Sequence, residues 1–71
     1  MLIEETELEM VKRHVRQGEE HVSRQLEIIA DMTRRCQHTD LAESLLFNLE
    51  VSLRAHRDHL EELNSTPTKL A

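Results

Sequence analysis

The chain has almost none of the residues that build β-sheets and their turns. Its 71 residues include one glycine, one proline and one aromatic residue. Strands are rich in aromatic and β-branched residues, and tight hairpin turns need glycine or proline, so this scarcity argues against a sheet. Leu, Glu, Arg, Gln and Met are abundant instead, and these residues favour helix. We expect an all-α protein, and the length allows one small domain at most.

Further absences limit where the protein acts and what it binds. Cys36 is the single cysteine, which excludes a disulfide within the chain, and a lone thiol without a signal peptide fits a reducing cytoplasm. No apolar run approaches the length of a membrane span. The 14 acidic and 9 basic residues give a net charge of −5, which argues against general nucleic-acid binding. We expect a cytoplasmic protein that contacts neither a membrane nor nucleic acid.

The apolar positions predict two amphipathic helices. They recur every three or four residues from Leu8 to Met32 and again from Leu45 to Leu63, and Thr6 with Glu9 has the spacing of a capping box. A connection this short forces the helices to fold back as an antiparallel hairpin. The predicted bounds are about 5–36 for the first helix, 37–39 for the turn, about 40–63 for the second helix and 64–71 for a flexible C-terminal tail.

Folding the chain about His38 and Thr39 brings one coiled-coil seam from each helix face to face. The seam carries polar residues where a coiled coil normally has Leu or Ile. The predicted polar core layer contains His21, Gln25, Ser52, His56, Gly18 and His59, with Gln25 against Ser52, His21 against His56, and Gly18 leaving room for the His59 ring. The whole seam comprises His14, Gly18, His21, Gln25, Ile28 and Met32 on the first helix and Leu45, Leu49, Ser52, His56, His59 and Leu63 on the second.

An aliphatic stripe runs beside the seam on each helix, rotated from it by roughly 75–90°. Because the helices are antiparallel, we expect both stripes on one side of the hairpin, where nothing in the chain covers them. Two-fold pairing into a four-helix bundle would bury them. Phe47 and Val51 point away from both stripes and are either scattered exposed residues or a contact for another protein. The expected dimer interface contains Leu8, Val11, Val15, Val22, Leu26, Ile29, Leu46, Leu53 and Leu60, with Ala42 on the same stripe.

Four histidines gather in the predicted bundle and admit three interpretations. His14, His21, His56 and His59 could form a hydrogen-bonded polar layer that sets the register, a metal site, or a pH sensor. The polar layer is favoured, because the His-x-x-x-His and Glu-x-x-His pairs of metal-binding bundles are missing. We therefore expect no bound metal.

The residues from Arg13 to Gln25 follow the pattern R-H-V-x-x-G-E-x-H-V-x-R-Q. Together with His38-Thr39-Asp40 and His56-Arg57-Asp58, this pattern resembles a group of uncharacterised helical-hairpin proteins from alphaproteobacteria. The resemblance covers roughly Val11 to Leu63. It implies a helical hairpin and no particular activity.

Function is predicted mainly by exclusion. No Ser/His/Asp set or glycine-rich phosphate loop is present, so we expect no enzyme and no cofactor. We predict a small protein-interaction or regulatory module that acts as a homodimer, with a histidine-based metal-binding bundle as the alternative. A further alternative is an RNA-binding hairpin dimer of the ROP type, or a phosphotransfer-type dimerisation module, since His21-Val22-Ser23-Arg24 resembles the His-x-x-Arg box of histidine kinases. The next proline is missing, however, and His21 is expected in the seam, whereas a phosphoacceptor must be exposed.

Overall fold

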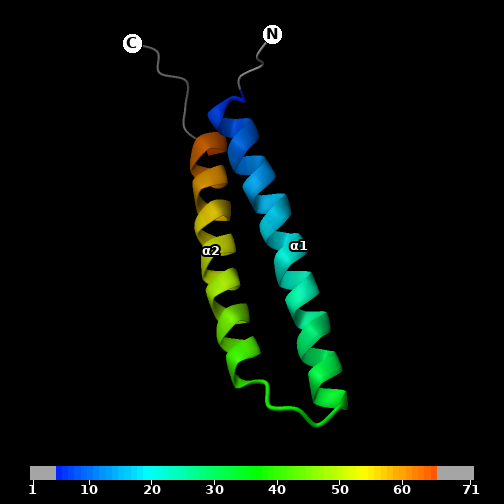
Figure 1. Cartoon of the computed structure of the whole chain (residues 1–71). Helices are drawn as coiled ribbons and strands as arrows, with labels where there is room; N and C mark the ends of the chain where they lie inside the picture. Colours follow the sequence, from blue (N-terminus) through cyan, green and yellow to red (C-terminus); the bar gives the residue numbers. More distant parts are fainter. Residues whose placement is uncertain (1–4, 66–71) are drawn as a thin grey trace, which may run out of the picture.

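The structure is a computed structural model that describes residues 5–65. It consists of two antiparallel helices joined by a short connection (Figure 1). Helix α1 spans Glu7–Arg34 and helix α2 spans Asp40–Ser65, with no strand in the described range. The all-α hairpin is therefore confirmed. Helix α2 runs two residues beyond its predicted end, and the rest of the predicted tail, 66–71, lies outside the described residues.

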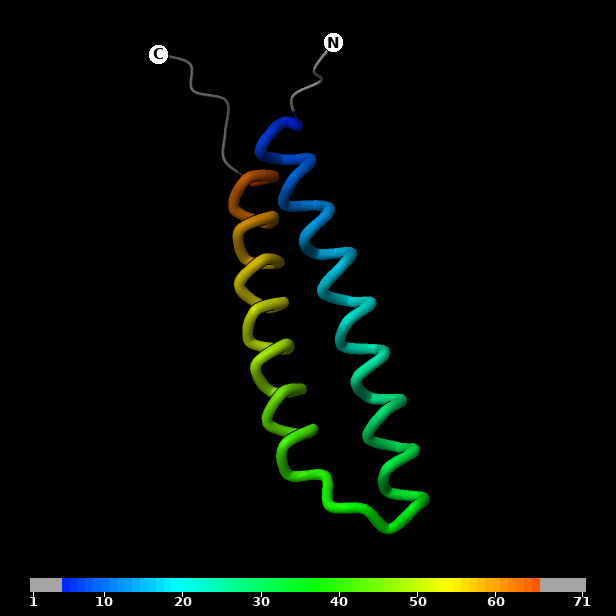
Figure 2. Tube along the Cα trace, viewed as in Figure 1, coloured from blue at the N-terminus to red at the C-terminus, as the bar shows by residue number. Residues whose placement is uncertain are grey.

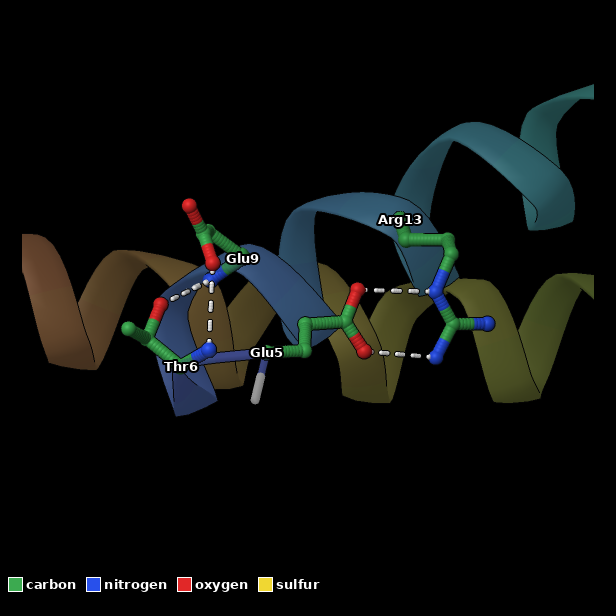
Figure 3. Close-up of polar contacts among 4 residues, drawn as sticks. All are labelled: Glu5, Thr6, Glu9 and Arg13. Carbon is green, nitrogen blue, oxygen red and sulfur yellow. Dashed lines mark hydrogen bonds and ion pairs between the residues drawn. The ribbon is translucent and has the colours of Figure 1, made fainter. Parts of the chain in front are cut away.

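The predicted capping box starts α1. The Thr6 hydroxyl accepts a hydrogen bond from the Glu9 N–H, and the Thr6 N–H donates to the Glu9 carboxylate, both at 3.1 Å (Figure 3). These two bonds satisfy backbone donors that a helix start leaves free. The helix therefore begins at Glu7, and the acidic residues of its first turn suit the positive end of the helix dipole.

A bidentate ion pair ties Glu5 to the second turn of α1. Arg13 Nε donates to Glu5 Oε2 at 3.0 Å and Nη2 donates to Oε1 at 2.9 Å (Figure 3). This hydrogen bonding holds the pKa of the Glu5 carboxyl below its ordinary value. The contribution of the pair to stability is therefore present above the unfolded-state pKa of Glu5 and is lost as the pH falls through the lower, folded-state pKa.

Helix α1 ends in a left-handed turn at a residue that is not glycine. Cys36 has a φ of 58°, its N–H donates to the Thr33 carbonyl at 3.0 Å, and the Gln37 N–H donates to the Met32 carbonyl at 2.9 Å. These two bonds are those of a Schellman motif, in which the left-handed position is usually glycine. Cys36 is exposed at this turn.

The connection between the helices is longer than predicted, because α1 stops at Arg34 and α2 starts at Asp40. In Figure 2 the helices diverge toward the bend, and the connecting residues cross the gap between them. The second helix is then capped locally: the Thr39 carbonyl accepts from the Glu43 N–H at 2.8 Å, and the Thr39 hydroxyl donates to the Glu43 carboxylate at 2.6 Å. The longer crossing displaces α2 along α1 relative to the predicted register.

In this register the surface between the helices contains residues of both predicted apolar surfaces, since Gln25 and Gly18 of the seam lie there beside Val11 and Leu53 of the aliphatic stripe. Val11 and Leu53 belong to the aliphatic stripe, yet they are 1% and 6% exposed between the helices of a single chain. Our expectation that the stripe is bare on one hairpin is therefore wrong for these two residues. The half-buried members of the stripe are Leu8, Val15, Val22, Ile29, Ala42, Leu46 and Leu60, and Leu26 is exposed.

Gly18 marks the closest approach of the two helices. A Cβ atom at this position would lie 3.0 Å from Leu53 Cδ1 and 3.5 Å from Leu53 Cβ. The predicted contact between Gly18 and His59 is wrong, because Leu53 occupies that place. The missing side chain still has the predicted purpose, which is to make room for a residue of α2.

Replacing Cys36 with glycine should stabilise the protein. Glycine adopts the left-handed region without the penalty of a Cβ atom, so Cys36→Gly should raise the free energy of unfolding by about 1 kcal/mol. Chemical denaturation followed by circular dichroism measures this difference. Gln37→Gly is the matched control, because Gln37 has no positive φ to relieve. Equal effects of the two substitutions would contradict our account of the turn.

Gly18→Leu should destabilise the protein by about 1–3 kcal/mol, because the larger side chain overlaps with Leu53. The same substitution should be less damaging in a Leu53→Ala background, where space has been opened. A double-mutant cycle measured by denaturation gives the coupling between the two positions. A Gly18→Leu variant more stable than the parent would show that the helices do not meet here.

Candidate functional site

Most of the predicted seam lies on one open face of the hairpin. Ile28 and Leu45, near the bend, are 41% and 49% exposed, and His21 and Ser52 are exposed farther along. Spacings of three, four and seven residues keep these positions on one side of each helix. We call this surface the histidine face. It consists of His14, His21, Ile28 and Met32 of α1 and Leu45, Leu49, Ser52, His56, His59 and Leu63 of α2.

A hollow of about 150 Å³ in the histidine face collects most of the predicted polar residues. Three imidazoles reach it, His14 and His21 from α1 and His56 from α2. The rings of His14 and His56 are in contact, with centroids 4.9 Å apart and planes tilted by 55°. The full lining is His14, Gln17, Gly18, His21, Leu49, Ser52, Leu53 and His56.

The ring contact corrects the predicted pairing of histidines. His56 meets His14 instead of His21, which follows from the displaced register of α2. His59 lies apart from the hollow, and its Nε2 atom is 3.1 Å from Glu7 Oε2. Of the predicted polar core layer, Gly18, His21, Ser52 and His56 line the hollow, and Gln25 and His59 do not.

Gln25 is the buried polar residue of the described helices. It is 7% exposed, and its Nε2 atom donates to the Ala42 carbonyl in the first turn of α2 at 2.8 Å. The predicted layer of Gln25 with Ser52 is therefore wrong. The observed bond joins the two helices near the bend, and it can form at only one register of α2 along α1. Sequence reasoning missed it because its acceptor is a backbone atom.

No group of three or more His, Cys, Asp or Glu side chains within residues 5–65 is arranged to hold a metal ion. His14 and His56 offer two nitrogen donors in one chain, whereas a zinc ion takes four ligands. His38 is exposed in the connection between the helices. Any metal on the histidine face would need ligands from outside a single chain.

The opposite side of the hairpin carries a charged groove. This open hollow of about 560 Å³ has Val22, Leu26 and Leu53 among its apolar lining. An ion pair between Arg57 Nη2 and Glu19 Oε2, 2.9 Å apart, joins α2 to α1 there. The complete lining of the charged groove is Glu19, Val22, Ser23, Leu26, Glu50, Leu53, Arg54, Arg57 and Asp58.

Other predicted contact residues are accessible on one chain. Phe47 is 64% exposed and Val51 is 51% exposed, on a part of α2 that lines neither the hollow of the histidine face nor the charged groove. His21 is exposed, so the burial that we invoked against a phosphoacceptor role does not hold for a single hairpin. The missing proline after Arg24 still separates the sequence from the histidine-kinase box.

Gln25→Glu should destabilise the protein by roughly 2–3 kcal/mol at pH 7, because a buried carboxylate would face the Ala42 carbonyl. Burial raises the pKa of such a carboxyl, and its protonated form can donate to the carbonyl, so the loss should shrink as the pH falls toward 4. Denaturation at both pH values tests this expectation. Gln37→Glu, at an exposed position in the connection between the helices, is the control and should show little change. Equal behaviour of the two variants would argue that Gln25 does not join the helices.

Comparisons with known proteins provide no information about this site, so its geometry alone is interpreted. Neither helix in the described part of the chain is long and apolar enough to cross a membrane. The resemblance to alphaproteobacterial helical-hairpin proteins stays a prediction. Protein families, curated proteins and solved structures were all compared with this chain, and none of them matches it.

Proposed function

We propose that this protein is a non-catalytic interaction module that pairs with a second copy of itself through the histidine face, forming a four-helix bundle. The observation that carries the proposal is the size of the core. Val11 and Leu53 are the buried apolar residues of the described helices. Two such side chains contribute a few kcal/mol, and helical chains of this size usually need a partner for stability.

Apolar side chains left open near the bend support pairing. Ile28 and Leu45 remain 41% and 49% exposed where the helices diverge, and Met32 and Leu49 beside them are half-buried. A second hairpin would cover these four side chains and supply the core that one hairpin lacks. We therefore place the interface on the histidine face and not on the aliphatic stripe, because the most buried members of the stripe lie inside the hairpin.

Charge favours the histidine face over the charged groove. The residues that define the histidine face have aliphatic, thioether, imidazole and hydroxyl side chains, and the carboxylate in contact with them is Glu7, beside His59 at the open end. The charged groove is lined by Glu19, Glu50, Arg54 and Arg57, among others. Burying those charges would require removing their hydration, which is expensive even for paired ions. Neutral imidazoles can be buried at a smaller penalty and can hydrogen-bond across an interface.

The available area is sufficient for a stable dimer. Helix α2 has 26 residues, which corresponds to a length of about 39 Å at 1.5 Å per residue. Two helices side by side, each about 10 Å across, present a face of about 800 Å² per chain. Pairing would then bury about 1,600 Å² in total, the size of a standard specific interface.

Leu45→Asp should convert the dimer into monomers, because it places an unpaired charge in the proposed interface. Val51→Asp is the matched control: it changes an aliphatic residue of the same helix with similar exposure, outside the histidine face. Sedimentation at micromolar concentration gives the mass of each variant, and circular dichroism shows whether it is folded.

A well-folded monomer of the unaltered chain at micromolar concentration would overturn the proposal. Dissociation by Val51→Asp together with a dimeric Leu45→Asp variant would also do so, because the interface would then lie on another face of α2.

A further inference from the structure

The ring centroids of His14 and His56 have a separation that suits two ligands of one metal ion. A zinc–nitrogen bond of about 2.0–2.1 Å places an imidazole centroid about 3.2 Å from the metal, so two rings at a tetrahedral angle have centroids about 5 Å apart. The observed separation is 4.9 Å. The two rings come from different helices, and the displaced register of α2 brings them together.

The rings of this pair make no hydrogen bond to a described residue, and the Glu5 carboxyl lies near enough to His14 for an electrostatic interaction. Among residues 5–65, neither His14 nor His56 takes part in a hydrogen bond or an ion pair, whereas the third half-buried histidine, His59, contacts Glu7. The hollow around the pair is lined by no Asp, Glu, Lys or Arg, so nothing there competes for the ring nitrogens or repels a cation.

From these observations we infer that His14 and His56 of two chains together form a four-imidazole site for a divalent transition metal such as Zn²⁺. The inference rests on the proposed pairing through the histidine face, because one chain supplies two of the four ligands. Imidazole nitrogen is a common ligand for zinc, nickel and cobalt. The site is complete only in the dimer, and the metal would stabilise the dimer by binding to it alone.

The histidine pair and the apolar residues near the bend together favour one arrangement of the two hairpins. His14 is toward the open end of the hairpin and Ile28 is toward the bend. If the two-fold axis is parallel to the helices, each residue lies at the same height along the bundle as the same residue of the other chain. The two histidine pairs then meet, and so do the apolar residues near the two bends. An axis across the helices at the level of the histidines would also bring the two pairs together, but it would leave the apolar residues near each bend uncovered. Burying those residues together with a four-imidazole site therefore requires both bends at the same end of the bundle.

Cobalt and zinc binding to the chelator-treated protein test this inference. Co²⁺ should bind with the strong visible absorption of a tetrahedral site, at one metal per two chains, and Zn²⁺ should displace it. His14→Ala and His56→Ala should each abolish the absorption. His38→Ala is the control, because His38 is exposed in the connection, and it should leave binding unchanged.

The outcomes separate this inference from the proposed function. A dimer that binds neither Co²⁺ nor Zn²⁺ would overturn the metal site and leave the pairing intact. A chain that stays monomeric with and without metal would overturn the pairing and the site with it. Metal retained at one ion per chain by a monomeric Leu45→Asp variant would overturn the shared site, because one chain would then be enough.

Discussion

Two helices can bury only one surface between them, and each helix of this chain has two apolar surfaces to cover. This constraint governs the rest of the structure. The aliphatic stripe is buried at Val11 and Leu53, where Gly18 lets the helices approach. The histidine face is left on the outside with Ile28 and Leu45 exposed. The proposed pairing follows from that remainder, since an uncharged and partly apolar face of this size is better covered than solvated.

Much of the fold could be predicted because its signals are local. The capping box of Thr6 and Glu9, the two amphipathic periods and the hairpin all depend on residues within a few turns of one another. The register could not be predicted in the same way. It depends on a left-handed turn at Cys36, and a non-glycine residue gives no sequence signal for that conformation. A connection of different length then placed Leu53 opposite Gly18 and the Ala42 carbonyl opposite Gln25, which the predicted register did not.

The histidines of the candidate site were predicted to lie together, but the pair that is in contact was predicted wrongly. His14, His21 and His56 line one hollow, as seven-residue spacing suggested, but His14 is the residue that contacts His56. A comparison of the two surfaces contained a usable signal. The stripe of Val, Ile and Leu is the more apolar one, and burying it inside the hairpin would have selected the observed register. The bond from Gln25 to the Ala42 carbonyl had no such signal, because any backbone carbonyl could have accepted it.

The turn at Cys36 has a practical consequence for anyone who studies this rod-shaped molecule. It leaves the single thiol of the chain exposed at the bend of the hairpin. The chain therefore has one attachment point for a spin label or a fluorophore, in the connection between the helices and outside the residues of the histidine face. Pulsed resonance or energy-transfer spectroscopy on such a derivative reads out tip-to-tip geometry directly, without any engineered cysteine.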